Sequence, residues 1–107
     1  MLIKTLAVSK AALEEFCRRW KVKELALFGS ILRDDFQPGS DVDVLVTFTP
    51  EADWSLFDHV KMQLELKALF QREIDLVSRR AIERSQNWIR RDNILKTAQV
   101  IYAAHQR

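Results

Sequence analysis

The 107-residue chain contains little glycine and proline and a single cysteine, and these shortages exclude several classes of protein. Cys17 alone excludes an internal disulfide and a cysteine-based zinc site, and it fits a reducing cytoplasm. No apolar run approaches the roughly 20 residues that a membrane span requires, and Met1 to Lys4 does not resemble the start of a signal peptide. Average usage would give about seven glycines, but only Gly29 and Gly39 occur. We therefore expect a single soluble domain over residues 1–107, in which each glycine meets a backbone requirement.

Charge is distributed unevenly, although the formal net charge is only +2. Residues 1–33 carry a net charge of +4, residues 34–75 carry −7, and residues 76–107 carry +5. An acidic centre between basic ends is typical of a cation site beside an anionic ligand, but also of ordinary solvated surface. Composition by itself leaves both interpretations open.

Hydrophobic periodicity predicts helices that alternate with strands. This order predicts an α/β (α+β) fold with a small mixed sheet of three to four strands flanked by helices. The predicted helices follow Ser9 (residues 11–20), Ser30 (Ile31–Asp34) and Ser55 (Leu56–Phe70), with a further one over residues 80–95, and Gln37–Ser40 forms a turn. The predicted strands are Val22–Phe28, Asp41–Phe48, Glu73–Val77 and Ala98–Tyr102.

Two of the predicted helices carry apolar residues that we expect to face the core. The first set, at helical spacing, is Leu56, Val60, Leu64 and Leu69. The second set is Ile82, Trp88, Ile89 and Leu95.

Three aspartates form a candidate metal site. Asp41 and Asp43 lie two residues apart on a predicted strand, which places both carboxylates on one face with Cα atoms about 6.6 Å apart. Val42 and Val44 then face the core. Asp75 joins the pair if its own strand lies beside theirs. Adjacent like charges persist most easily beside a cation, and three carboxylates can hold two metal ions for phosphoryl transfer, Mg²⁺ being the best match.

A glycine–serine turn provides a candidate phosphate site beside these aspartates. Gly29 and Ser30 lie where a predicted strand meets a short helix, so a phosphate can approach the backbone and the N–H groups of the helix N-terminus. Arg33 either binds phosphate or pairs with a neighbouring aspartate. Ser40 directly precedes the first aspartate and either orients it or contacts phosphate. The simpler alternative is that this serine and aspartate only complete a turn at Pro38-Gly39.

These residues, in this order, resemble the motif of the nucleotidyltransferase superfamily that includes DNA polymerase beta. Gly29-Ser30, a spaced Arg33, and Ser40-Asp41-x-Asp43 match its pattern, and Asp75 looks like its third carboxylate. Nearly the whole chain is similar to the minimal nucleotidyltransferase group of that superfamily. One position departs from the pattern, because Asp34 follows the arginine where many relatives carry a small residue.

The resemblance implies a polymerase beta-like nucleotidyltransferase fold and an enzyme that transfers AMP from ATP to a hydroxyl with two Mg²⁺ ions. Minimal members resemble antitoxins of two-gene toxin–antitoxin systems, which adenylylate a tyrosine of a HEPN-domain ribonuclease toxin. The chain is then expected to be cytoplasmic, without a membrane partner, and to form a homo-oligomer or a hetero-oligomer with the toxin. The resemblance implies that Asp41, Asp43 and Asp75 are catalytic and metal-binding, and that Gly29, Ser30, Arg33 and Ser40 bind the nucleotide.

Other functions remain open on the sequence. The main alternative is a catalytically weak binding module that neutralises its partner by contact, which Asp34 in the motif keeps open. Transfer to a small molecule or to a nucleic acid would call for a further substrate module, and none is visible. His59, His105 and Cys17 are expected to be structural. Five arginines are expected to form a solvated face or to meet an acidic partner or RNA: Arg79, Arg80, Arg84, Arg90 and Arg91.

Overall fold

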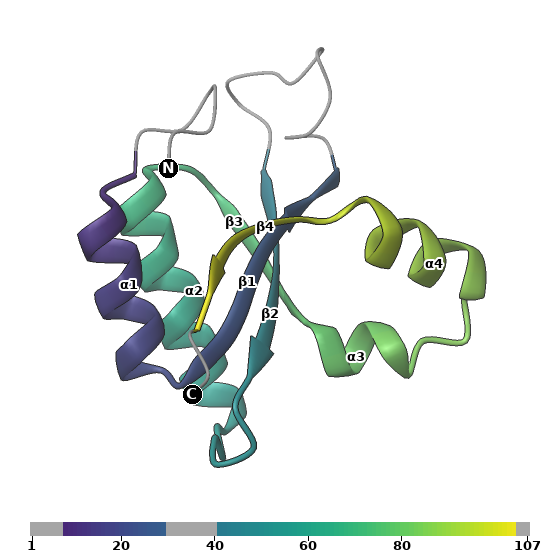
Figure 1. The fold of residues 1–107 in the computed structure, drawn as a ribbon, viewed down its shortest axis with the longest axis horizontal. Helices are drawn as coiled ribbons and strands as arrows, with labels where there is room; N and C mark the ends of the chain where they lie inside the picture. Colours follow the sequence, from purple (N-terminus) through teal and green to yellow (C-terminus); the bar gives the residue numbers. More distant parts are fainter. Residues whose placement is uncertain (1–7, 30–40, 105–107) are drawn as a thin grey trace.

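A mixed four-stranded sheet with helices on both faces forms the protein in its computed structural model, which describes residues 8–29 and 41–104 (Figure 1). The elements are α1 (Lys10–Arg19), β1 (Val22–Phe28), β2 (Val42–Phe48), α2 (Leu56–Phe70), β3 (Ile74–Ser78), α3 (Arg79–Glu83), α4 (Trp88–Thr97) and β4 (Gln99–Ala103). The strand order is β3-β2-β1-β4. β2 runs parallel to β3, whereas β1 is antiparallel to both β2 and β4. The predicted fold class is confirmed.

Each face of the sheet has its own hydrophobic core. On one face, Leu27, Val42 and Val44 pack with residues of α1 and α2. On the other face, Phe28 and Leu45 pack with buried residues of α3 and α4. Figure 1 shows the two pairs of helices on opposite sides of the sheet. Because successive side chains of a strand alternate between faces, residues beside Val42 and Val44 on β2 point toward the α3 and α4 side.

Cys17 belongs to the first of these cores and is fully buried. Burial, together with the nearby charge of Glu14, raises the pKa of its thiol to about 12. The thiol is therefore protonated at neutral pH and acts as a packing group, as predicted.

The predicted ends of the long helix are correct, but its predicted core stripe is wrong. A capping box between Ser55 and Asp58 starts α2 as expected. The side chains of Leu56, Val60 and Leu64 are 79%, 50% and 59% exposed. Of the predicted stripe only Leu69 packs against the core, where the fully buried or nearly buried residues of α2 are Met62, Leu66 and Phe70.

The observed orientation of α2 provides hydrogen-bond partners for backbone groups of β3, which is an edge strand of the sheet. The backbone N–H of Leu76 donates to Gln63 Oε1 at 3.1 Å, and its carbonyl lies 2.8 Å from His59 Nε2. Two polar side chains of α2 thus satisfy edge groups that would otherwise lie unpaired beneath the helix. Turning the predicted stripe toward the sheet would break both contacts.

The helix predicted over residues 80–95 is two helices, α3 and α4, separated at Ser85–Asn87. Ser85 Oγ accepts a hydrogen bond from the Asn87 N–H at 3.2 Å, and Asn87 Oδ1 caps α4 by accepting from the Arg90 N–H at 3.1 Å. These short polar side chains compete with helical hydrogen bonds and so end one helix and start the next. Of the predicted packing residues, Ile82 is buried and Leu95 partly buried, but Trp88 and Ile89 are exposed.

The fourth strand was predicted over Ala98–Tyr102 and is found as β4 (Gln99–Ala103). The short helix predicted over Ile31–Asp34 and the turn predicted over Gln37–Ser40 lie outside the described residues.

We expect Leu66→Ala to lower the free energy of unfolding by about 2–5 kcal/mol, because it leaves a cavity in the core. The matched variant Leu64→Ala, on the exposed side of the same helix, should change it by no more than about 0.5 kcal/mol. Urea denaturation followed by circular dichroism measures both. Equal losses would contradict the observed orientation of α2.

Candidate active site

Asp43 and Asp75 are direct partners across the parallel β2–β3 pair. Residues in register on neighbouring strands project to the same face, with the strands about 4.8 Å apart. That face is the one covered by α3 and α4, because Leu45 and Val77, each two residues further along, pack in the core beneath those helices. The condition on which Asp75 was predicted to join the site, that its strand lies beside that of Asp43, is thus met.

Charge and burial act together on Asp43, which is half-buried. Burial raises the pKa of its carboxyl, and the negative charges of Asp75 and Asp41 raise that pKa further, whereas Arg90 lowers it. All three charged groups are therefore near enough to influence Asp43. A carboxylate that is partly desolvated and faces like charges is stabilised by a bound cation.

Gly29 lies directly beneath this carboxylate. Asp43 is the partner of Phe28 across β1 and β2, so Gly29 is the first residue beyond their paired segment. Gly29 has a φ of 77°, and a Cβ added there would collide with Asp43 Oδ2 and lie 3.3 Å from Asp43 Cγ. The prediction that this glycine meets a backbone requirement is confirmed, since any side chain would displace the carboxylate.

Asp41 immediately precedes β2 rather than lying within it. The next residue, Val42, donates its N–H to the carbonyl of Glu73 at 2.8 Å, which fixes the start of β2 against the start of β3. Asp41 is exposed. The other predicted site residues, Ser30, Arg33 and Ser40, lie outside the described residues, as does the departure from the pattern at Asp34.

The carboxylates at this end of the sheet offer ligands for a metal ion. Within residues 8–29 and 41–104, no three His, Cys, Asp or Glu side chains are close enough together, as they stand, to hold a metal ion. The pair formed by Asp43 and Asp75 nevertheless offers hard oxygen ligands, and each of these carboxylates would gain from a neighbouring cation. The donor chemistry at this sheet end fits a magnesium ion, and the set of three ligands remains a prediction.

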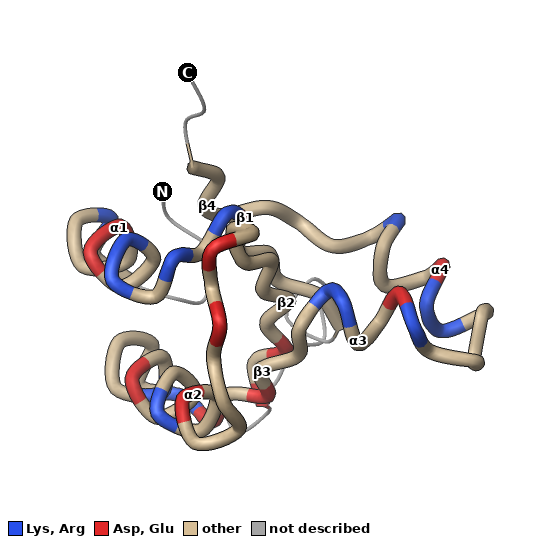
Figure 2. Tube along the Cα trace, turned by 90° about the horizontal axis from the view of Figure 1, so that it is seen from below, with Lys and Arg blue, Asp and Glu red and all other residues tan. Residues whose placement is uncertain are grey.

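Arg90 lies near the site, although it was predicted only as one of five arginines that form a solvated face or meet an acidic partner or RNA. It lies on α4 and its charge reaches Asp43. Figure 2 shows acidic positions on β2 and β3 and basic positions on α3 and α4, the helices that cover the same face. In the sequence, Arg90 lies four residues before Ile94, so both lie on the same side of a helix. This spacing indicates that Arg90 faces the sheet only when it is known that Ile94 is buried against the sheet.

Comparison with known proteins decides the family. Residues 9–101 match the sequence profile of the family described as nucleotidyltransferase domain. The chain belongs to this nucleotidyltransferase family. Since that match spans most of the chain, the resemblance inferred from the motif is confirmed, and the protein is a nucleotidyltransferase enzyme.

Two curated relatives have adenylyltransferase names. The nucleotidyltransferase is 34% identical over 70 residues to protein adenylyltransferase MntA of Thermococcus cleftensis, which covers 65% of this chain and 69% of that protein. It is also 30% identical over 84 residues to a Methanocaldococcus jannaschii protein assigned as a protein adenylyltransferase. That alignment covers 75% of this chain and 84% of the relative.

Solved structures show the same fold. One described as a minimal nucleotidyltransferase has a TM-score of 0.63 and 29% identity, and the match covers 87% of this chain and 86% of that one. A toxin–antitoxin structure with AMP-PNP has a TM-score of 0.67 and 17% identity, covering 92% of this chain and 77% of that one. The second likeness supports the fold alone.

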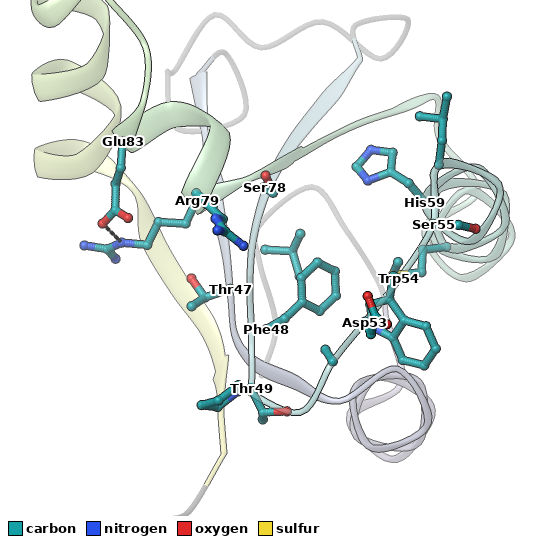
Figure 3. Close-up of a pocket in the computed structure, with 16 residues that line it drawn as sticks. Thr47, Phe48, Thr49, Asp53, Trp54, Ser55, His59, Ser78, Arg79 and Glu83 are labelled. Atoms are coloured by element: carbon teal, nitrogen blue, oxygen red, sulfur yellow. Dashed lines mark hydrogen bonds and ion pairs between the residues drawn. The ribbon is translucent and has the colours of Figure 1, made fainter.

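A hollow of about 820 Å³ lies away from the carboxylates, around the opposite end of β2 (Figure 3). Phe48, Trp54 and His59 line it, and none of the three aspartates does. The Trp54 indole N–H donates to the carbonyl of Trp20 at 2.8 Å, and His59 contacts the backbone of β3. These polar groups serve the fold, so the structural role predicted for His59 is confirmed.

Among the described residues of the nucleotidyltransferase, no helix is long and apolar enough to cross a membrane.

We expect Asp43→Asn to raise the free energy of unfolding of the metal-free protein at pH 7. A carboxyl whose pKa is raised by folding binds its proton more tightly in the folded state, so its contribution to stability is lost as the pH rises through that pKa. The gain should fade below about pH 4, where the carboxyl is protonated in both states. Urea denaturation in EDTA across this pH range measures the effect.

The control is Asp53→Asn, an exposed aspartate that lines the hollow at the other end of β2. It should change the free energy of unfolding at pH 7 by no more than about 0.5 kcal/mol, as expected for an exposed surface position. A loss of stability at pH 7 in Asp43→Asn, relative to this control, would contradict the electrostatic description of the site.

Proposed function

We propose that this nucleotidyltransferase transfers AMP from ATP to a hydroxyl of a partner protein, a tyrosine of a HEPN-domain ribonuclease toxin, and so acts as an antitoxin. The observation that carries the proposal is the register pairing of Asp43 with Asp75 directly above Gly29. The identity to a protein adenylyltransferase named MntA supports the choice of reaction. Toxin–antitoxin complexes among the structural neighbours are compatible with the choice of partner.

The proposed roles follow from position. Asp41, Asp43 and Asp75 would hold two Mg²⁺ ions, which supply charge neutralisation and an activated oxygen nucleophile in this class of reaction. Asp75, on the exposed side of the pair, assists loss of the proton from the acceptor hydroxyl. The nucleotide-binding set remains Gly29, Ser30, Arg33 and Ser40, in which Gly29, without a side chain, leaves room for the Asp43 carboxylate beside the proposed phosphate site.

We further propose that residues 1–107 act as a single minimal domain. All the described elements belong to one sheet and its two helical layers. The choice of a protein acceptor is supported by the identity to the relative named protein adenylyltransferase MntA.

Incubation with ATP labelled at the α-phosphate, Mg²⁺ and the protein encoded by the neighbouring gene should label that neighbour. The double change Asp41→Asn and Asp43→Asn should lower the labelling rate about 100-fold or more, because it removes transition-state stabilisation of several kcal/mol. Circular dichroism should show an unchanged fold. Asp53→Asn, as the matched control, should label at the wild-type rate.

Labelling that survives the double change would refute the assigned site. Replacing the acceptor tyrosine of the partner by phenylalanine should abolish labelling while leaving binding intact. Labelling that persists in that variant would refute the proposed target.

A second candidate function is neutralisation of the partner by contact alone. The observation that favours it is the exposed apolar row on α2, formed by Leu56, Phe57, Val60 and Leu64. If the double aspartate variant still suppresses the partner's toxicity in cells, contact is sufficient for the biological effect. If suppression is lost together with labelling, AMP transfer is the function.

A further inference from the structure

The position of α4 places one of its arginines near the catalytic face. Ile94 is buried against Phe28 of β1 and Leu45 of β2. Arg90 lies four residues earlier, so it projects from the same side of the helix, one turn nearer the N-terminus. Leu45 and Asp43 are two residues apart and share a face of β2. The helix therefore presents Arg90 to the side of the sheet that bears the carboxylates.

The approach of α4 also has a direction across the sheet. The helix leads directly into β4, and β4 pairs with β1. Strand β1 carries Gly29 at its end, whereas Asp75 lies on β3, at the opposite edge. Helix α4, which carries Arg90, is therefore connected to the sheet on the side of Asp43 where Gly29 and the proposed phosphate site lie. The proposed acceptor site lies on the other side, at Asp75.

The guanidinium of Arg90 is available for a ligand. It is exposed and makes no ion pair or hydrogen bond with the residues that the structure describes. By contrast, Arg79 pairs with Glu83 at 3.1 Å, and Arg91 contacts the carbonyl of Ser85 at 3.4 Å. Arg90 acts on Asp43 electrostatically but forms no salt bridge with it, so a gap separates the cation from the carboxylate.

We propose that Arg90 is a substrate-binding residue that donates hydrogen bonds to the β- and γ-phosphates of the nucleoside triphosphate, which leave as pyrophosphate. The inference rests on the proposed function and adds a residue to its site. A planar guanidinium matches phosphate oxygens, and neither the base nor a neutral acceptor hydroxyl calls for a cation. In the proposed reaction the α-phosphate lies beside the aspartates. The β- and γ-phosphates then extend into the gap between Asp43 and Arg90, where the guanidinium can bind them.

Arg90 assists the step in which AMP passes to the acceptor. The acceptor oxygen forms a bond to the α-phosphorus, and the bond from that phosphorus to the oxygen bridging to the β-phosphorus breaks. The departing pyrophosphate takes the electron pair, and the acceptor proton passes toward Asp75 and solvent. Arg90 neutralises charge that accumulates on the pyrophosphate as this bond breaks.

Equilibrium titration calorimetry with AMP-PNP and with inorganic pyrophosphate, each with Mg²⁺, tests the proposal on the complete chain. Arg90→Gln should weaken both affinities about tenfold, and Arg90→Lys should recover part of the loss because it restores the charge without the fork. Arg84→Gln, a matched control at the exposed C-cap of α3, should bind both probes like the wild type. In the transfer assay, Arg90→Gln should raise the KM for ATP about tenfold and leave the KM for the acceptor protein unchanged.

Wild-type affinity for both probes in Arg90→Gln would overturn the inference, as would a rise confined to the KM for the acceptor. Weakened binding in Arg90→Gln, combined with a wild-type protein that transfers no AMP, would support Arg90 while refuting the proposed function. A wild-type protein that binds neither probe would overturn both.

Discussion

The parallel pairing of β2 with β3 is the constraint on which the site depends, because it sets two carboxylates side by side. Asp43 and Asp75 gain nothing from each other, and burial makes the charge on Asp43 costlier still. The fold tolerates this repulsion because both strands are fixed by other means. Val42, Val44 and Leu76 are nearly or fully buried on the opposite face, and their packing holds the register that places the aspartates together.

Strand β3 is held from its outer side as well. As an edge strand it would leave backbone groups unpaired, and α2 supplies His59 and Gln63 to the two polar groups of Leu76. The same helix is the crossover that makes the β2–β3 pairing parallel. One helix therefore sets the topology and secures the edge strand that carries Asp75, and in doing so it turns an apolar row outward. The exposed row of α2 is a consequence of how the strand that carries Asp75 is supported.

The two helical layers have different tasks. The layer of α1 and α2 covers a continuous core and holds the sheet. The layer of α3 and α4 covers a smaller core, and of its arginines Arg90 of α4 acts on Asp43, whereas Arg79 and Arg80 of α3 line the hollow at the opposite end of β2. This asymmetry suits a nucleotidyltransferase, since a polyanionic substrate needs carboxylates to bind its metal ions and cations to bind its phosphates.

The sequence by itself determined the strands, most helix starts and the motif. Alternation fixed β2, serine caps fixed the starts of α1 and α2, and the rarity of glycine pointed to Gly29, because each of these signals is local. Only the tertiary structure decided which side of α2 faces the core, since apolar residues occur on both sides of the helix and only the side with Met62, Leu66 and Phe70 also brings His59 and Gln63 to the edge of β3. It also decided that Asp75 lies beside Asp43 and that Arg90 is near enough to act on Asp43, because strand pairing and helix packing join residues far apart in sequence. The break between α3 and α4 at Ser85–Asn87 combines both situations. The short polar side chains that cause it are a local signal, but the apolar residues on both sides predicted one continuous helix.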